Sequence, residues 1–201
     1  EIKAYQAQIN PHFLHNTLNN IKWVAITKKE NEIAEMIASL GELLESVMRN
    51  KSGMIKVKDE IKLLHSYISL QKFRYKDKFN IFFHIDERIY DFYIPNLILQ
   101  PIIENSIFHG AGNRSYIEIH VYGNQFNQEL LFRIKDNGCG IPKQKLESIF
   151  DDKNENNHMG LINIKRRIQL KFGEQYDVII NSEPDVGTEV TINLPVIDSI
   201  H

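Results

Sequence analysis

The apolar residues of this chain follow two different spacings. Up to residue 75 they recur every three or four positions, as on a helix with one buried face, which predicts helices over residues 10–24, 30–49 and 58–75. Farther along they alternate with polar residues, which predicts strands over residues 79–85, 117–121, 130–135, 178–181 and 189–194. Helical spacing returns between these strands and predicts helices over residues 99–110, 143–150 and 161–172.

Turn-forming residues mark where these elements end. Asn10 and Pro11 are a favourable helix start, because asparagine caps helices and proline suits the first helical position. Gly173 suits the position just after a helix. Turns or loops are also expected at Gly123-Asn124, at residues 151–158, which include three asparagines, and at residues 184–188.

The order of the elements predicts an α+β protein with two parts. Residues 1–75 form a helical region, and residues 76–201 form an α/β sandwich in which helices cover one face of a sheet. Consecutive strands without a helix between them favour a mixed sheet over a purely parallel one. The two helices of the first 50 residues cannot bury their apolar faces in each other alone, and a dimeric four-helix bundle is the simplest arrangement that covers them.

Composition narrows the function classes. The chain has 201 residues, 42% of them hydrophobic and 25% charged, an ordinary balance for a globular protein. Its formal net charge of −2 argues against general nucleic-acid binding. One cysteine, Cys139, excludes an intramolecular disulfide framework and a multi-cysteine zinc site. No apolar run approaches the roughly 18–20 residues of a membrane span, and because the chain begins at Glu1 within a helical pattern, we expect a fragment of a longer protein.

Two stretches offer polar groups for ligand binding, and each has a plain structural alternative. Glu104 and Asn105 are hard oxygen ligands suited to Mg²⁺, or simply solvated residues at the edge of a helix. Asp136-x-Gly138-x-Gly140 follows a strand. Its glycines let the backbone approach a flat or anionic ligand, and its carboxylate can accept a hydrogen bond from an adenine amino group. Aspartate and glycine are also common in ordinary turns.

Two further stretches are weaker signals. Gly160 precedes a helix whose free backbone N–H groups suit phosphate, or it is a simple helix start. Gly187-Thr188 is by itself a turn that leads into a strand. The phosphate-binding motif Gly-x-x-x-x-Gly-Lys-Ser/Thr is absent from the sequence, which argues against an ordinary P-loop NTPase.

Taken together and in this order, the four stretches resemble the N, G1, G2 and G3 boxes of the Bergerat ATP-binding fold. Histidine kinases, type II topoisomerase ATPase domains, the Hsp90 chaperone and MutL-type repair proteins share that fold. Residues 8–19 resemble the phosphoacceptor box of the LytS/YesM-type sensor histidine kinases, and residues 99–105 and 187–195 are also like that family. The resemblance covers nearly the whole chain.

The resemblance implies a role for individual residues. His12 would be the phosphorylated residue, and Glu104 would contribute to metal binding or to proton removal. Asn105 would carry Mg²⁺. The residues implied in ATP binding are Asn105, His109, Asp136, Gly138, Gly140, Ile141, Gly160, Leu161 and Thr188. Some positions depart from the family pattern: His15 replaces an aromatic residue, His158 stands where the family has a glycine, and Phe108 stands where many kinases carry a basic residue.

The function implied is that of a protein-histidine kinase, the core of a two-component regulatory system. It would bind ATP and Mg²⁺, phosphorylate itself on His12, and pass the phosphoryl group to an aspartate of a response regulator. The expected assembly is a homodimer without nucleic acid, in a cytoplasmic fragment of a bacterial cell-membrane protein whose membrane contact runs only through a missing N-terminal sensor region. Two alternatives stay open: an inactive nucleotide-binding signalling module, and a non-kinase ATPase of the same fold.

Overall fold

The computed structural model describes residues 11–49, 52–110, 112, 114–147 and 159–200. The chain divides into two compact units, the first of residues 1–53 and 61–76 and the second of residues 54–60 and 77–201. Helix α4 (Val57–Tyr75) runs through both, because its first turn belongs to the second unit and the rest to the first. Within the described ranges, no helix combines the length and apolarity needed to cross a membrane.

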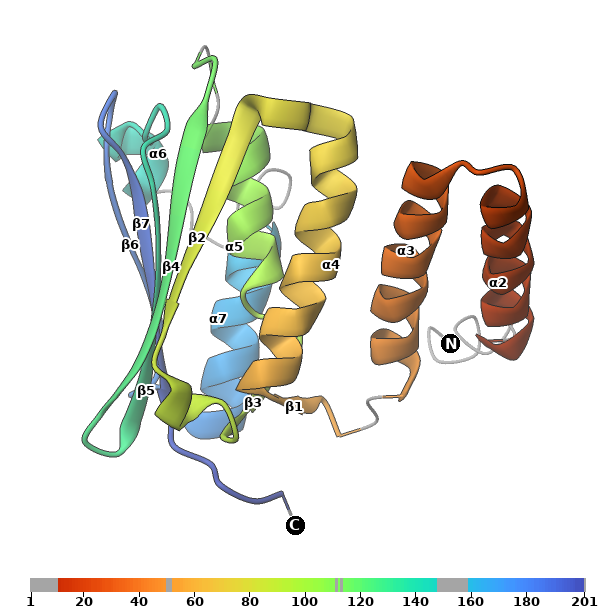
Figure 1. Ribbon diagram of the computed structural model, residues 1–201. Helices are drawn as coiled ribbons and strands as arrows, with labels where there is room; N and C mark the ends of the chain where they lie inside the picture. The colour runs from red at the N-terminus through yellow and green to blue at the C-terminus, as the bar shows by residue number, and fades with distance from the viewer. Residues whose placement is uncertain (1–10, 50–51, 111, 113, 148–158, 201) are drawn as a thin grey trace, which may run out of the picture. The chain divides into compact units, whose positions relative to one another are not determined.

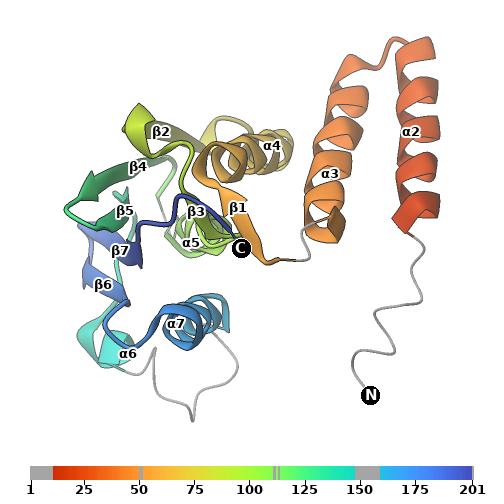
Figure 2. The ribbon, with the colours of Figure 1, turned by 90° about the horizontal axis from the view of Figure 1, so that it is seen from below.

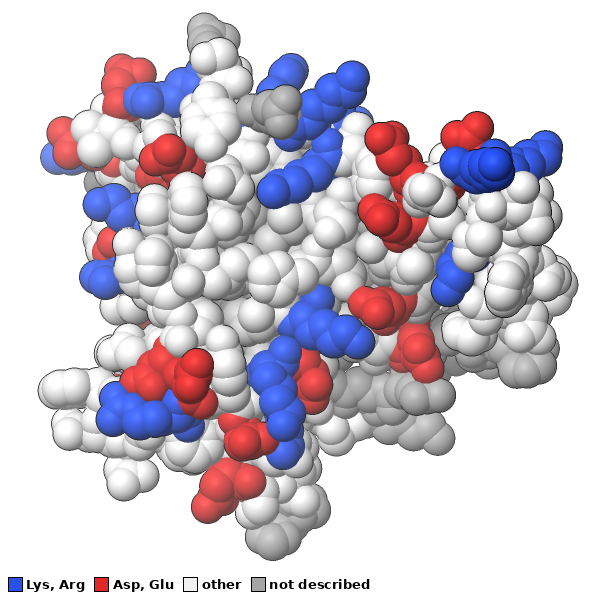
Figure 3. All heavy atoms as spheres, in the orientation of Figure 1, with Lys and Arg blue, Asp and Glu red and all other residues white. Residues whose placement is uncertain are grey.

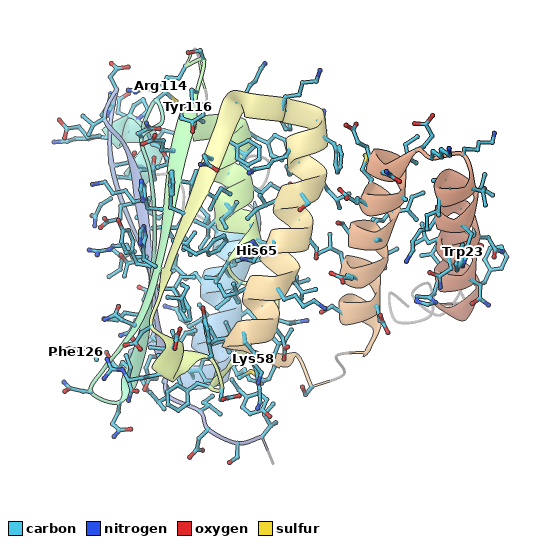
Figure 4. The ribbon with its side chains drawn as sticks, in the orientation of Figure 1. Trp23, Lys58, His65, Arg114, Tyr116 and Phe126 are labelled. Atoms are coloured by element: carbon cyan, nitrogen blue, oxygen red, sulfur yellow. The ribbon has the colours of Figure 1, made fainter. Side chains whose placement is uncertain are left out.

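The first unit contains a hairpin of two helices, α2 (Pro11–Thr27) and α3 (Asn31–Arg49), as Figure 1 shows. Both were predicted. Lys29 adopts φ 60° in the connecting turn. From α4, Ser66 donates a hydrogen bond to Glu42 of α3 (Oγ to Oε2, 2.5 Å). Large apolar side chains of the hairpin remain exposed, among them Phe13, Ile21, Trp23, Val24, Ile26, Ile33, Met36 and Leu40; Figure 4 labels Trp23.

The second unit is built on a five-stranded sheet with the strand order β2-β4-β5-β7-β6. The strands are β2 (Phe79–Ile85), β4 (Ile117–Phe126), β5 (Glu129–Asp136), β6 (Val178–Glu183) and β7 (Gly187–Pro195). β2 and β4 are parallel, and the other neighbours are antiparallel. The predicted mixed sheet is therefore confirmed. Figure 4 labels Tyr116, which immediately precedes β4, and Phe126, the last residue of β4.

Helices cover one face of this sheet, as predicted. Figures 1 and 2 show α5 (Gln100–Asn105) and α7 (Met159–Phe172) on the same side of it. Burial alternates along β4 and β5, because every second side chain points toward the helices. The core between sheet and helices contains Ile102, Ile103, Ile107, Ile117, Ile119, Val121, Leu130, Phe132, Ile134, Ile164, Ile168, Val190, Ile192 and Leu194.

Shorter elements complete the second unit. β1 (Met54–Lys56) and β3 (Tyr93–Pro95) form a two-stranded antiparallel sheet that was not predicted. The 3₁₀ helices are η1 (Lys76–Lys78) and η2 (Glu87–Ile89), and α6 (Lys143–Glu147) is a short α-helix. The predicted helix over residues 143–150 is thus confirmed as far as Glu147, and its remainder and the predicted loop at 151–158 lie outside the described residues.

Two expectations were wrong. Gly123 and Asn124 lie inside β4, and the hairpin turn comes later, where Asn127 adopts φ 54°. Glycine suits this strand position because a Cβ on residue 123 would come within 2.9 Å of Ile85 and 3.0 Å of Phe132, whose side chains fill that space. The helix expected over residues 99–110 ends as an α-helix at Asn105 and continues as a π-helical turn, η3 (Ser106–Gly110).

Candidate nucleotide-binding site

A cavity of about 180 Å³ opens between the α5–η3 segment, the loop after β5, and the strands β6 and β7. Its apolar wall includes Ile102 of α5, Leu161 of α7 and Ile180 of β6. The remaining lining residues are Asn105, Ser106, His109, Gly110, Asp136, Cys139, Gly140, Ile141, Pro142, Lys145, Thr188 and Val190. An apolar pocket with a few convergent polar groups is the usual form of a small-molecule site.

Asp136 is the polar centre of this cavity. It is the last residue of β5 and only 4% exposed. Its Oδ1 accepts hydrogen bonds from the backbone N–H groups of Gly138 (2.9 Å) and Thr188 (3.2 Å). Its Oδ2 accepts a hydrogen bond from the hydroxyl group of Ser106 (2.7 Å). The carboxylate is therefore held by β5, β7 and η3 together, and Oδ2 keeps a lone pair for a further donor.

The two glycines after Asp136 allow close contact between backbone segments. A Cβ at position 138 would lie 2.5 Å from the carbonyl oxygen of Gly110, which itself accepts a hydrogen bond from Cys139 N (2.8 Å). Gly140 adopts φ +68°, and a Cβ there would lie 2.0 Å from the carbonyl oxygen of Glu183. Only glycine fits either position, so the loop after β5 is pressed against η3 on one side and against the end of β6 on the other.

Ser182 and Thr188 extend the polar network across β6 and β7. Their hydroxyl oxygens lie 2.9 Å apart, at paired positions of the two strands. Ser182 donates its proton to the carbonyl oxygen of Gly187 (3.0 Å), so Thr188 is the donor between the two hydroxyl groups. The Ser182 oxygen also accepts from Ile141 N (2.8 Å). Thr188 is thus fixed at the cavity wall with its own lone pairs available.

Residues 94–198, which contain this whole cavity, match the family of histidine kinase-, DNA gyrase B-, and HSP90-like ATPases. The chain belongs to that family. Residues 1–79 match the histidine kinase family. Sensor histidine kinase YesM of Bacillus subtilis is 35% identical over 196 residues, which are 97% of this chain and 33% of that protein. Sensor protein LytS of Staphylococcus saprophyticus is 34% identical over 201 residues, 97% of this chain and 34% of that protein.

These two relatives are about three times as long as the part that this chain matches. Among solved structures, the histidine kinase domain of a blue-light activated histidine kinase from Erythrobacter litoralis superposes with a TM-score of 0.56 at 15% identity, over 92% of this chain and 94% of that one. The catalytic domain of histidine kinase ThkA superposes with a TM-score of 0.55 at 14% identity, over 71% of this chain and 93% of that one. The resemblance to LytS/YesM-type kinases and the fold expected from it are confirmed.

In this ATPase-family chain, the cavity gathers most of the residues that the sequence singled out. Those that line it are Asn105, His109, Asp136, Gly140, Ile141, Leu161 and Thr188. Glu104, Gly138 and Gly160 are not lining residues. Gly138 donates its backbone N–H to the lining residue Asp136. Gly160 faces Pro101, and a Cβ added to Gly160 would lie 3.3 Å from the Cβ of Pro101. His12 lies on α2 in the other unit, and its side chain is outside the described part of the structure.

Asn105 is the described side chain best suited to a metal ion here. It is half-buried at the end of α5 and lines the cavity, and its side chain contains an amide oxygen. In the part of the chain that the structure describes, no group of three or more His, Cys, Asp or Glu side chains is placed to hold a metal. Mg²⁺ commonly takes only one or two protein ligands and completes its shell with water and phosphate oxygens, so a single amide oxygen fits this ion.

Sequence reasoning missed Ser106, Ser182 and Gly110. Ser106 directly follows Asn105 and was a candidate by position alone. Ser182 is identified only through its pairing with Thr188 across the strands, and Gly110 only through its contact with the loop after β5. Arg167 of α7 donates a hydrogen bond to the backbone carbonyl of Asn96, so its side chain is already engaged within the protein.

Proposed function

We propose that this chain is the kinase core of a two-component sensor histidine kinase, and that its cavity binds Mg-ATP. The observation that carries the proposal is the buried Asp136 carboxylate, which faces an apolar cavity with an unused acceptor position. An adenine ring offers the complement, a flat apolar body with an exocyclic amino donor. The relatives named Sensor histidine kinase YesM and Sensor protein LytS match both units of the chain.

The proposed roles follow from the position of each group. Asp136 accepts the hydrogen bond of the adenine amino group, with Thr188, Gly140 and Ile141 around the ring. Asn105 supplies an oxygen ligand to Mg²⁺, which when bound neutralises charge on the phosphate oxygens. Glu104 assists at the metal or takes up a proton. Gly138 belongs to the adenine end, where its backbone N–H holds Asp136. The remaining contacts, nearer the phosphates, are assigned to His109, Gly160 and Leu161.

His12 is the proposed phosphoacceptor. A neutral imidazole nitrogen is a competent nucleophile near neutral pH. Its lone pair forms the new bond to the γ-phosphorus, while the bond from that phosphorus to the bridging oxygen breaks and ADP leaves with the electron pair. The phosphohistidine then passes its phosphoryl group to an aspartate of a response regulator. The functional division is proposed between residues 1–75 and 76–201.

The exposed apolar side chains of α2 and α3 support the proposed homodimer. Phe13 is 67% exposed and Trp23 64% exposed in the single chain. Apolar surface of this kind on a two-helix hairpin is covered when a second hairpin completes a four-helix bundle. On the face shown in Figure 3, basic and acidic side chains are interspersed, and we propose no nucleic-acid partner. The membrane sensor is proposed for the part of the protein that precedes this chain.

The test is incubation of the chain with γ-labelled Mg-ATP, followed by measurement of protein-bound label after acid and after alkali. We expect label that is lost in acid, survives in alkali, and is absent from His12→Ala. Label that persists in His12→Ala and disappears in His15→Ala would move the phosphoacceptor to the neighbouring turn of α2. Nucleotide binding without any label would identify the chain as an inactive module, and steady phosphate release without label as a non-kinase ATPase.

A further inference from the structure

Glu60 is a fully buried carboxylate outside the cavity. It lies in the first turn of α4 and has no exposed surface. Its Oε2 accepts a hydrogen bond from Leu97 N (2.8 Å) and its Oε1 from Leu99 N (3.2 Å). Burial raises the pKa of this carboxyl group, and the backbone N–H groups of residues 97–99 and the charge of Arg167 oppose that shift. Buried carboxylates are retained only with such partners, so the group has a specific structural task.

The segment that Glu60 holds does not have a relaxed conformation of its own. Leu97 adopts φ +54°, a left-handed backbone conformation that is disfavoured for residues other than glycine. The neighbouring carbonyl of Asn96 accepts a hydrogen bond from Arg167 of α7. Glu60 and Arg167 therefore both form hydrogen bonds with the backbone of residues 96–99. We call residues 96–99 with these two partners the Glu60 cluster.

The Glu60 cluster leads directly to the cavity. Leu99 immediately precedes α5, whose Ile102 and Asn105 line the cavity, and Ser106 follows as the donor to Asp136. From Leu99 to Asn105 the helix rises only about 9 Å at about 1.5 Å per residue, with no break in which a displacement could be absorbed. On the other side, Arg167 belongs to the same helix as Leu161, another lining residue.

We infer that Glu60 is a positioning residue for the nucleotide site: it fixes the start of α5 and thereby the place of Asn105 and Ser106 at the cavity wall. The inference rests on the proposed function, since it concerns the same cavity. It makes the first turn of α4, a helix that runs through both compact units, part of the support of the nucleotide site. A change in that turn would then alter nucleotide affinity without touching the nucleotide.

Glu60→Gln tests this in the full chain. The amide keeps the shape, but only one of its two polar atoms is an acceptor, so either Leu97 N or Leu99 N faces a donor. In a fraction of the molecules the start of α5 is then displaced. The apparent affinity for nucleotide falls in proportion to the fraction of molecules that keep the binding-competent conformation. We expect ADP and ATP to bind about tenfold more weakly, which corresponds to about 1.4 kcal/mol. Affinity is measured by titration calorimetry and stability by urea unfolding.

The matched control is Leu130→Ala. Leu130 is fully buried in β5 and pairs with Leu194, at the end of the strand opposite Asp136. This variant loses stability and keeps wild-type nucleotide affinity. An equal loss of affinity in both variants, or wild-type affinity in Glu60→Gln, overturns the inference and leaves the proposed function standing. Absence of nucleotide binding by the wild-type chain overturns the proposed function itself.

Arg167→Met tests the Glu60 cluster from the side of α7. It provides the test of the inference if Glu60→Gln does not fold. Methionine keeps much of the apolar length of the side chain but removes the donor to Asn96 and the charge that faces Glu60. We expect a smaller decrease of nucleotide affinity in the same direction. Wild-type affinity in a folded Arg167→Met overturns the inference.

Discussion

Asp136→Asn separates the structural role of this residue from its proposed role in nucleotide recognition. The substitution changes one carboxylate oxygen to an NH₂ group and leaves the shape of the side chain unchanged. The asparagine oxygen can occupy the Oδ1 position and keep the hydrogen bonds from Gly138 N and Thr188 N. In the wild-type chain the hydroxyl group of Ser106 donates to Oδ2. In the variant this hydroxyl group can rotate and accept a hydrogen bond from the new NH₂ group.

The two effects have different magnitudes. Because all three internal hydrogen bonds keep a partner, we expect the free energy of unfolding to change by no more than about 1 kcal/mol. At the cavity, however, the acceptor for the adenine amino group becomes a donor. Loss of a hydrogen bond to a charged group is worth about 1.5–3 kcal/mol, so ATP affinity falls about 10- to 150-fold. Asp136→Ala, in contrast, leaves two backbone N–H groups and a hydroxyl group without their partner and destabilises by about 1–3 kcal/mol for each.

Calorimetric titration with ATP and with inosine triphosphate is the assay. Inosine carries a carbonyl acceptor where adenosine carries the amino donor, so the wild-type chain should prefer ATP and Asp136→Asn should lose or invert that preference. Urea unfolding of the same samples gives the stability of each variant. The reasoning is refuted if Asp136→Asn keeps the wild-type preference for ATP, or if it is as unstable as Asp136→Ala.

Further predictions concern one close backbone approach, one surface carboxylate paired with two lysines, and the independence of the two units. Gly140→Ala should lower the free energy of unfolding in urea by more than about 2 kcal/mol, because residue 140 has a positive φ and lies against the backbone carbonyl of Glu183. Gly41→Ala in α3, where the space around the residue is open, should instead raise the free energy of unfolding by about 0.5–1 kcal/mol. Hydrogen bonds from Lys58 and Lys56 lower the pKa of Asp91 to about 2. This group stabilises the fold above the unfolded value of about 3.9 and loses that contribution as pH falls through about 2. Thermal unfolding of Asp91→Asn should therefore lie slightly below wild type near neutral pH, merge with it in strong acid, and respond to salt; a difference that grows in acid contradicts the assignment. His12→Ala should keep wild-type ATP affinity while losing label, since every lining residue lies between Ile102 and Val190.

The elements that sequence predicted well are those with one buried face. In β4, alternate side chains from Ile117 to Val121 are buried, and this alternation is visible in the sequence because it is imposed by the core. β1 and β3 have three residues each, too few to show any period. A π-helical turn such as Ser106–Gly110 has nearly the same apolar spacing as an α-helical one over five residues, so the pattern cannot distinguish them.

The candidate site was predictable to the extent that its residues are adjacent in sequence. Asp136-x-Gly138-x-Gly140 indicated where the cavity opens, because an acceptor and two glycines follow a strand directly. Ser182 and Ser106 reach the same network only through strand pairing and through the packing of η3 against β5. Such contacts depend on register and on layer packing, which composition and spacing do not specify.

The glycines of the site also have a physical task different from the one that their sequence suggested. Position 138 approaches the backbone at Gly110 and position 140 the backbone at Glu183, so the close neighbour in both cases is protein and not ligand. Gly187, with φ +142°, brings the start of β7 equally close to the carbonyl oxygen of Asp136. Three close backbone approaches therefore fix this part of the cavity wall. A wall fixed in this way spends little binding free energy on ordering the loop after β5, which leaves more of it for discrimination between nucleotides by Asp136.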